Sequence, residues 1–132
     1  MLEFGSFSSH RSLSRKRVGR IGERLARFYL RSQGYSFVEK NYRSERGEID
    51  LIMTSKNELV FFEVKTRQTK YGQDLIFDSV STEQINKLNQ TAKRYITERL
   101  GKKWRGKFRF DVIGIILTDD HLVDIQVLRS FL

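Results

Sequence analysis

The fold of this chain is decided by two apolar runs, Arg46-Gly-Glu-Ile-Asp-Leu-Ile-Met-Thr54 and Glu58-Leu-Val-Phe-Phe-Glu-Val-Lys-Thr-Arg67. The short polar break between them predicts that they form a β-hairpin. Side chains in a strand point alternately to its two faces. Glu48 and Asp50 are therefore expected to share one face of the first strand, and Ile49 and Leu51 the other.

The second run carries charge in the same way. Glu63 and Lys65 are expected on one face, with Phe62 and Val64 opposing them. Three carboxylates and one ammonium would then gather at one end of a hairpin whose other face is apolar. Solvated surface charge gives no reason for such an interruption of apolar strands, so this arrangement indicates a site.

The chemistry that fits these residues is a divalent-cation site. Magnesium prefers carboxylate and water oxygens, and one or two carboxylates suffice when substrate phosphates complete its shell. A metal-bound water near phosphate is a nucleophile at neutral pH, and a neighbouring Lys can offset the charge that develops on the phosphorus oxygens. The alternative is a cross-strand salt-bridge cluster of Asp50, Glu63 and Lys65 that sets the strand register. Glu48 either supports the ligands or points past them as a surface charge.

A family resemblance is carried by an ordered set of short motifs. Asp50, twelve intervening residues and then Glu63-Val64-Lys65 resemble the PD-(D/E)XK nuclease signature, which includes type II restriction enzymes and archaeal Holliday-junction resolvases. More closely, the chain resembles the YraN family of small bacterial proteins over residues 18 to 131. The matching pieces are Gly22-Glu23 with Ala26, Asn41-Tyr42-Arg43, Gly47-Glu48-Ile49-Asp50-Leu51-Ile52, Phe62-Glu63-Val64-Lys65-Thr66-Arg67, Tyr71-Gly72 and Arg109-Phe110-Asp111-Val112.

This resemblance implies roles for particular residues. Asp50 and Glu63 would bind Mg²⁺ or Mn²⁺, joined by the Val64 carbonyl, and Lys65 would position the attacking water or stabilise the transition state. Glu23 would be an auxiliary ligand; the alternative is a solvated helix carboxylate paired with Arg20 or Arg27. Two positions depart from the pattern. Ile49 replaces the signature's Pro, and Gln84 stands where a Lys is usual, although its amide can still contact phosphate or water.

Composition indicates a basic, single-domain protein. The chain has 132 residues, a net charge of +9 and a pI near 10. This charge favours nucleic acid as partner, with an anionic membrane second; the alternative is a soluble protein whose basic charge has no functional meaning. The absence of Cys excludes disulfides and Cys-based zinc sites, and His10 and His121 lack metal-ligand spacing. No apolar run reaches the roughly 18 residues of a membrane span. With no signal-peptide pattern, a cytoplasmic location is expected.

The N-terminal region is expected to be a basic, flexible arm over residues 1–17, followed by one nuclease-like domain over residues 18–132. The arm is interpreted as a disordered tail, as a source of phosphate contacts, or as a segment that docks through Leu2, Phe4 and Phe7. Its basic side chains are Arg11, Arg15, Lys16 and Arg17. An amphipathic helix is predicted over residues 18–33, ended by Gly34, and a strand over residues 35–42.

After the hairpin, residues 66–79 are predicted to form a loop in which Arg67 and Lys70 meet phosphate and Tyr71 stacks on a base or packs on the hairpin. A second helix is predicted over residues 82–100, with Ser81 and Gln84 as a capping box. The basic turn around Trp104 either grips a nucleic-acid backbone or covers the sheet edge. Strands are predicted over residues 108–118, where Arg109 and Asp111 pair structurally, and over residues 122–128.

The predicted order is α-β-β-β-α-β-β, an α/β fold with a restriction-endonuclease-like mixed sheet flanked by helices. The function expected is metal-dependent hydrolysis of phosphodiester bonds, in DNA rather than RNA, with no membrane partner. Resemblance to junction resolvases implies branched DNA and a homodimer, while single strands, flaps and duplex remain open. The alternatives are a catalytically inactive nucleic-acid-binding module that acts with a repair or recombination partner, and a basic adaptor for proteins or anionic lipid.

Overall fold

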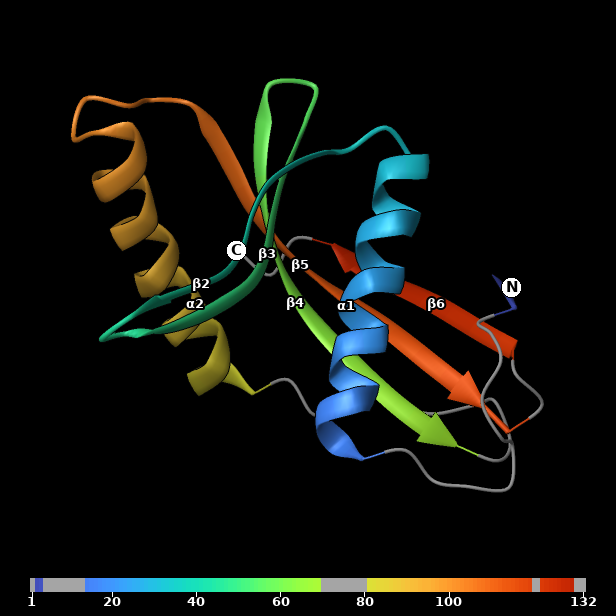
Figure 1. Ribbon diagram of the computed structural model, residues 1–132. Coiled ribbons are helices and arrows are strands. Elements are labelled where there is room, and N and C mark those ends of the chain that lie inside the picture. Colours follow the sequence, from blue (N-terminus) through green and yellow to red (C-terminus); the bar gives the residue numbers. More distant parts are fainter. Residues whose placement is uncertain (1, 4–13, 70–80, 120–121, 130–132) are drawn as a thin grey trace.

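A computed structural model describes residues 2–3, 14–69, 81–119 and 122–129 of the chain. Its sheet has the order β1-β6-β5-β4-β3-β2 (Figure 1). Only β4 and β5 run parallel, and every other neighbouring pair is antiparallel. The strands are β1 (Leu2–Glu3), β2 (Ser36–Ser44), β3 (Gly47–Ser55), β4 (Glu58–Thr69), β5 (Lys107–Thr118) and β6 (Leu122–Arg129). Apart from the short β1, this is the predicted order and a mixed sheet, so the predicted α/β fold is confirmed.

Two helices cover opposite faces of the sheet. Helix α1 (Arg15–Ser32) packs through Ala26 and Leu30 on a core that includes Phe62 and Ile113. Helix α2 (Thr82–Tyr95) packs through Leu88 and Tyr95 on the other face, in a second core centred on Phe61 and Phe110. Successive residues of β4 belong to different cores, because side chains of a strand point alternately to its two faces. None of the helices in the described parts of the chain is long and apolar enough to cross a membrane.

Helix α1 begins at Arg15, three residues earlier than the sequence predicts. Ser14 caps it, because its side-chain oxygen accepts a hydrogen bond of 3.2 Å from the backbone N–H of Arg17. The basic residues Arg15, Lys16 and Arg17 therefore belong to the first helical turn rather than to an arm. The helix ends as expected, with Gly34 at φ +96° directly after the cap residue Gln33.

The β3–β4 hairpin turns tightly at Lys56 and Asn57, both with positive φ, between the paired residues Ser55 and Glu58. Strand β4 then continues to Thr69, so the prediction of a loop from residue 66 is wrong for residues 66–69. The reason is β5, which pairs in parallel with β4 along its whole length. Such pairing joins segments distant in sequence, which the local pattern around residue 66 does not encode.

Strands β3 and β4 part from each other at Asp50. Their pairing reaches Leu51 and Phe62, and the preceding residues of β3 leave β4 while remaining paired with β2. The expected shared face of Ile49 and Leu51 is therefore wrong, since Ile49 lies in the α2 core and Leu51 in the α1 core. Opposite this point, Asn41 of β2 adopts φ +54°, a left-handed conformation that interrupts the regular strand.

The end of the second helix also differs from the prediction, because residues Ile96–Leu100 form a π-helical turn after α2. Trp104 then packs against the α2 core and Phe108, which favours the covering role over the gripping one. Arg109 pairs with Asp111 as expected, its Nε lying 3.1 Å from Oδ2. Predictions for His10, Arg11, Lys70, Tyr71 and His121 fall outside the described residues, as do those for Phe4, Phe7 and Gly72.

Candidate functional site

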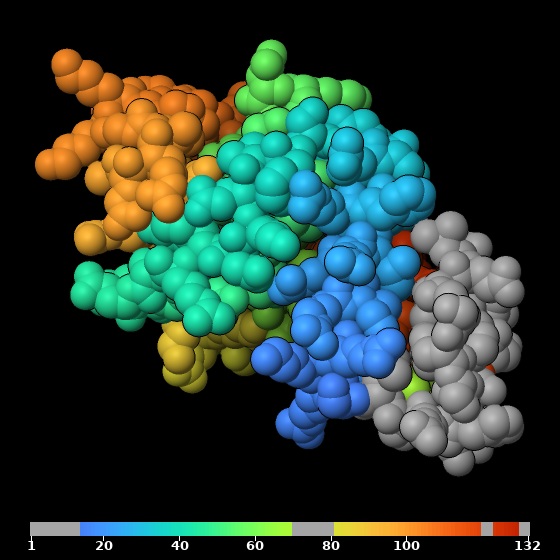
Figure 2. Space-filling model, in the orientation of Figure 1, coloured from blue at the N-terminus to red at the C-terminus, as the bar shows by residue number. Residues whose placement is uncertain are grey.

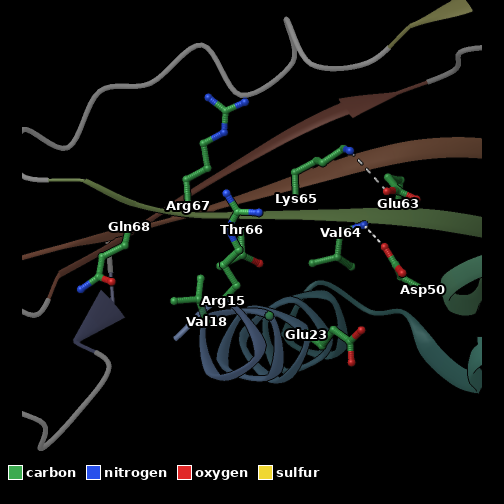
Figure 3. Close-up of a pocket in the computed structure, with 11 residues that line it drawn as sticks. Arg15, Val18, Glu23, Asp50, Glu63, Val64, Lys65, Thr66, Arg67 and Gln68 are labelled. Atoms are coloured by element: carbon green, nitrogen blue, oxygen red, sulfur yellow. Dashed lines mark hydrogen bonds and ion pairs between the residues drawn. The ribbon is translucent and has the colours of Figure 1, made fainter. Parts of the chain in front are cut away.

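The fork between β3 and β4 opens into a pocket against the N-terminal half of α1 (Figure 3). Asp50 comes from β3, six consecutive residues come from β4, and four residues come from α1. Its lining includes Arg15, Val18, Gly19, Glu23, Asp50, Glu63, Val64, Lys65, Thr66, Arg67 and Gln68. The structure therefore brings together all the residues that the sequence proposes as catalytic or metal-binding.

Asp50 is held at the fork by the backbone of β4. Its Oδ2 accepts a hydrogen bond of 2.8 Å from the N–H of Val64. The backbone pairing of β3 with β4 ends at Leu51 and Phe62. Beyond that point the Val64 N–H of β4 donates to the Asp50 side chain instead of to a backbone carbonyl of β3. In an extended strand the N–H and C=O of one residue point to the same side. The Val64 carbonyl is therefore directed to the same side of β4 as the Asp50 carboxylate.

Glu63 and Lys65 project from the face of β4 opposite to α1, as Figure 3 shows. The Nζ of Lys65 lies 3.5 Å from Oε1 of Glu63. The same oxygen accepts a hydrogen bond of 3.1 Å from Nε2 of Gln84 in α2. Ser81 caps α2 as predicted, accepting from the Gln84 N–H at 3.1 Å. The Gln84 side chain, however, extends to Glu63, so this residue positions a site carboxylate as well as beginning the helix.

The three carboxylates of the site have raised pKa values. Burial raises the pKa of Asp50 to about 7, helped by the negative charge of Glu63 and opposed by the Val64 hydrogen bond. Burial likewise raises the pKa of Glu63, and Lys65 lowers it. Burial also raises the pKa of Glu23. Burial thus disfavours the charged form of all three carboxylates, and a cation bound between them would offset this effect.

Glu23 faces the fork instead of pairing with its helical neighbours. The guanidinium of Arg27 lies 3.6 Å from the Phe37 ring centroid, and the charges acting on Glu23 are those of Lys40 and Glu48. A side-chain hydrogen bond from Asn41 also lowers the pKa of Glu23. Asn41 was not predicted as a site residue. The signal that could have found it is its residue type, because Asn tolerates the left-handed conformation that a strand interruption requires.

The approach of α1 to the site depends on Gly22. A Cβ atom at this position would lie 1.7 Å from Oγ1 of Thr66. Only a residue without a side chain therefore allows this turn of α1 to rest on β4, which places the next residue, Glu23, beside the fork. Thr66 was likewise not predicted as a site residue, because nothing local marks a contact between residues so far apart in sequence.

The other predicted site residues occupy different places. Glu48 is absent from the pocket lining and lies 3.6 Å from Arg43, although its charge raises the pKa of Asp50 and Glu63. Arg15 and Arg67 line the pocket. Lys16 and Arg17 are exposed on the first turn of α1. Within the described residues, no set of three acidic, Cys or His side chains is arranged to hold a metal ion by itself.

Fold and site together define an α/β protein that carries a half-buried carboxylate pair and a lysine at a strand fork. The chain belongs to the uncharacterised protein family UPF0102, the YraN family, whose model matches residues 22–115. A UPF0102 protein of Caldanaerobacter subterraneus is 38% identical over 85% of this chain and 89% of its own length. UPF0102 proteins of Clostridium botulinum and Clostridium novyi are 41% and 39% identical, each over 78% of this chain and over 82% and 83% of their own lengths.

Proposed function

We propose that this protein is a magnesium- or manganese-dependent nuclease that hydrolyses phosphodiester bonds in DNA. The observation that carries the proposal is the half-buried pair Asp50 and Glu63 at the β3–β4 fork, with Lys65 3.5 Å from Glu63. The resemblance to PD-(D/E)XK nucleases supports the same assignment of these residues. The basic character of the chain, at +9, agrees with a polyanionic substrate.

The donor set fits a hard divalent cation. Carboxylate and carbonyl oxygens are the ligands that Mg²⁺ prefers, and Asp50, Glu63 and the Val64 carbonyl would hold it. The raised pKa of Asp50 and Glu63 supports this fit, because a cation would stabilise the charged form that burial disfavours. Since no three side chains in the described residues form a ligand set, phosphate and water oxygens would complete the shell. When bound, the ion would neutralise phosphate charge and help to deprotonate the attacking water.

The remaining steps belong to the chain's own residues. Attack of water on phosphorus forms one P–O bond while the bond to the leaving oxygen breaks in line with it. The Lys65 ammonium would orient the water or offset the charge that grows on the phosphorus oxygens. Gln84 and Lys65, both in contact with Oε1, hold the Glu63 carboxylate in place. Glu23 would assist from the α1 side of the fork.

A purely structural ion-pair cluster explains these contacts less well. A cluster that fixes the hairpin register would join opposite charges across β3 and β4. Lys65 instead pairs with Glu63 of its own strand, and the Asp50 carboxylate accepts from a backbone N–H. Two ionised carboxylates at Asp50 and Glu63 repel each other, which lowers the free energy of unfolding when no cation is bound. A binding site accounts for that cost.

Cation binding tests this function directly and separates it from an inactive binding module. Mn²⁺ would be titrated calorimetrically above pH 7, with and without a nuclease-resistant phosphorothioate oligonucleotide. We expect the wild type to bind Mn²⁺, and Asp50→Asn and Glu63→Gln to lose most of that affinity. Glu83→Gln, on an 80% exposed side chain of α2, is the matched control and should bind as the wild type does. Equal binding by all four proteins, or none by the wild type, would refute the proposal.

A further inference from the structure

The outer face of α1 carries a row of arginines that the candidate site does not use. We define the α1 outer face as Arg17, Arg20, Arg24, Phe28 and Arg31, all exposed. Their spacing of three or four residues puts them on one side of the helix, over about 21 Å at 1.5 Å per residue. Within the described residues, none of these arginines forms an ion pair. Helix α1 lies at the front of the surface in Figure 2.

The α1 outer face also contains an exposed aromatic residue, Phe28, which does not contribute to solubility as the arginines do. Phe28 is 65% exposed, the most exposed large apolar side chain of the described residues. It lies in a shallow hollow lined by Arg24, Arg27, Phe28, Arg31 and Ser32. An adjoining hollow shares Arg27 and Arg31 and reaches Tyr35 and Phe37. An aromatic ring between guanidinium groups is an arrangement that takes a base on the ring and phosphates on the cations.

The residues of this face fit a single-stranded nucleic acid better than a lipid surface or a duplex. The apolar side of α1 is already buried against the sheet through Val18, Gly22, Ala26 and Leu30, so the helix has no second apolar face with which to enter a lipid surface. Base-paired duplex would offer phosphates but would keep its bases stacked away from Phe28. A single strand offers both, because its bases can turn out of the strand.

We propose that the α1 outer face binds a single-stranded nucleic-acid segment next to the cleavage position, with arginines on phosphates and Phe28 stacked on a base. The position follows from α1 itself, since Arg15 and Glu23 of the same helix line the candidate site. The placement of this segment next to a cleavage position rests on the proposed nuclease function, whereas its binding to the α1 outer face does not. The substrate is then a structure with a single-stranded tract, such as a flap or an overhang, rather than uninterrupted duplex.

Binding without divalent cations tests this proposal apart from cleavage. Fluorescence anisotropy would follow labelled oligothymidine and a blunt duplex of equal length in EDTA over a range of salt concentrations. Phe28→Ala should weaken oligothymidine binding about tenfold, as loss of one stacked base predicts, with little change for duplex. Phe28→Trp should retain single-strand binding, because indole also stacks.

The arginines are tested by the double variant Arg24→Gln/Arg31→Gln. It should lower the slope of log affinity against log salt for the single strand by about 1.4, since each phosphate contact contributes about 0.7. Lys102→Gln/Lys103→Gln removes the same charge from the exposed turn before β5 and serves as the control. Equal losses in the two double variants, or an unchanged Phe28→Ala, would overturn the proposal. So would failure to bind oligothymidine together with tight binding to polyglutamate, which would indicate an acidic protein partner.

The same variants distinguish this inference from the proposed function. If the wild type cleaves nucleic acid but the Phe28 and arginine variants bind and cleave as it does, the α1 outer face is wrong and the nuclease stands. If the selective loss of single-strand binding appears but no nucleic acid is ever cut, the surface stands and the nuclease assignment is wrong.

Discussion

At the scale of single residues, the site is organised around carboxylates that burial makes reluctant to ionise. Period-two alternation was enough to predict that Glu63 and Lys65 lie together on one face, because β4 is regular there. Asp50 lines the same pocket although the strand faces change at the fork, which the alternation does not predict. Asn41 could not be assigned to the site from the sequence. Gln84 was singled out there, but its contact with Glu63 depends on how α2 packs and could not be predicted.

The raised pKa of Asp50 predicts a pH-dependent cost to folding. Between its ordinary pKa of 3.8 and about 7, the folded state binds more protons than the unfolded chain, so the free energy of unfolding falls as the pH rises. Asp50→Asn removes this cost and keeps an oxygen to accept from Val64. The variant should be more stable than the wild type at pH 8 by on the order of 1 to 3 kcal/mol.

Urea unfolding at a series of pH values measures this difference, which should shrink as the pH falls towards 4. Since the cost arises from an uncompensated charge, Mn²⁺ should reduce it for the wild type alone. A difference between the two proteins that is the same at every pH would contradict the assignment.

Lys65 should affect the chemical step more than binding. Lys65→Met removes the ammonium beside Glu63 while keeping a chain of similar length. We expect single-turnover cleavage to slow by about 10²-fold or more, as with loss of one transition-state charge partner, with nucleic-acid affinity nearly unchanged. Lys87→Met, on an exposed face of α2, is the control. Full activity of Lys65→Met would show that Lys65 has no role in the chemical step.

At the scale of elements, the contact of α1 with β4 positions one side of the site. The helix itself followed from its apolar spacing, and its end from Gly34. Its start at Arg15, capped by Ser14, was not predicted because the basic residues before Val18 resemble a solvated arm. The close approach at Gly22 and Thr66 was not predictable, because a glycine in a helix does not identify the element that rests on it.

A pair of glycine substitutions tests this contact. Gly22→Ala places a methyl group against Thr66 and should lower the free energy of unfolding by about 1 to 3 kcal/mol, the usual cost of overpacking. Gly19→Ala, one turn away in the same helix, has nothing within 4 Å of the added Cβ. It should instead raise stability by about 0.5 to 1 kcal/mol through helix propensity. Thermal or urea unfolding compares the two, and similar effects at both positions would disprove the close approach.

In the whole molecule, the sheet holds α1 and α2 on opposite faces, and both helices contribute a residue that reaches the fork. A mixed sheet was predictable because it fits the order of the elements and agrees with the family resemblance. It did not predict the extension of β4 to Thr69, which depends on the parallel partner β5. The basic residues are spread over the chain, but those of α1 form a continuous row beginning near the site.

Metal-dependent cleavage can be measured in a single assay. Wild type, Glu63→Gln and the matched control Glu83→Gln, from identical preparations, would be incubated with labelled four-way junction, flap, single strand, duplex and RNA in Mg²⁺ and in Mn²⁺. We expect metal-dependent cutting of DNA that contains a single-stranded tract by wild type and Glu83→Gln, and none by Glu63→Gln. Equal cutting by all three proteins, or binding without cutting by the wild type under every condition, would contradict it.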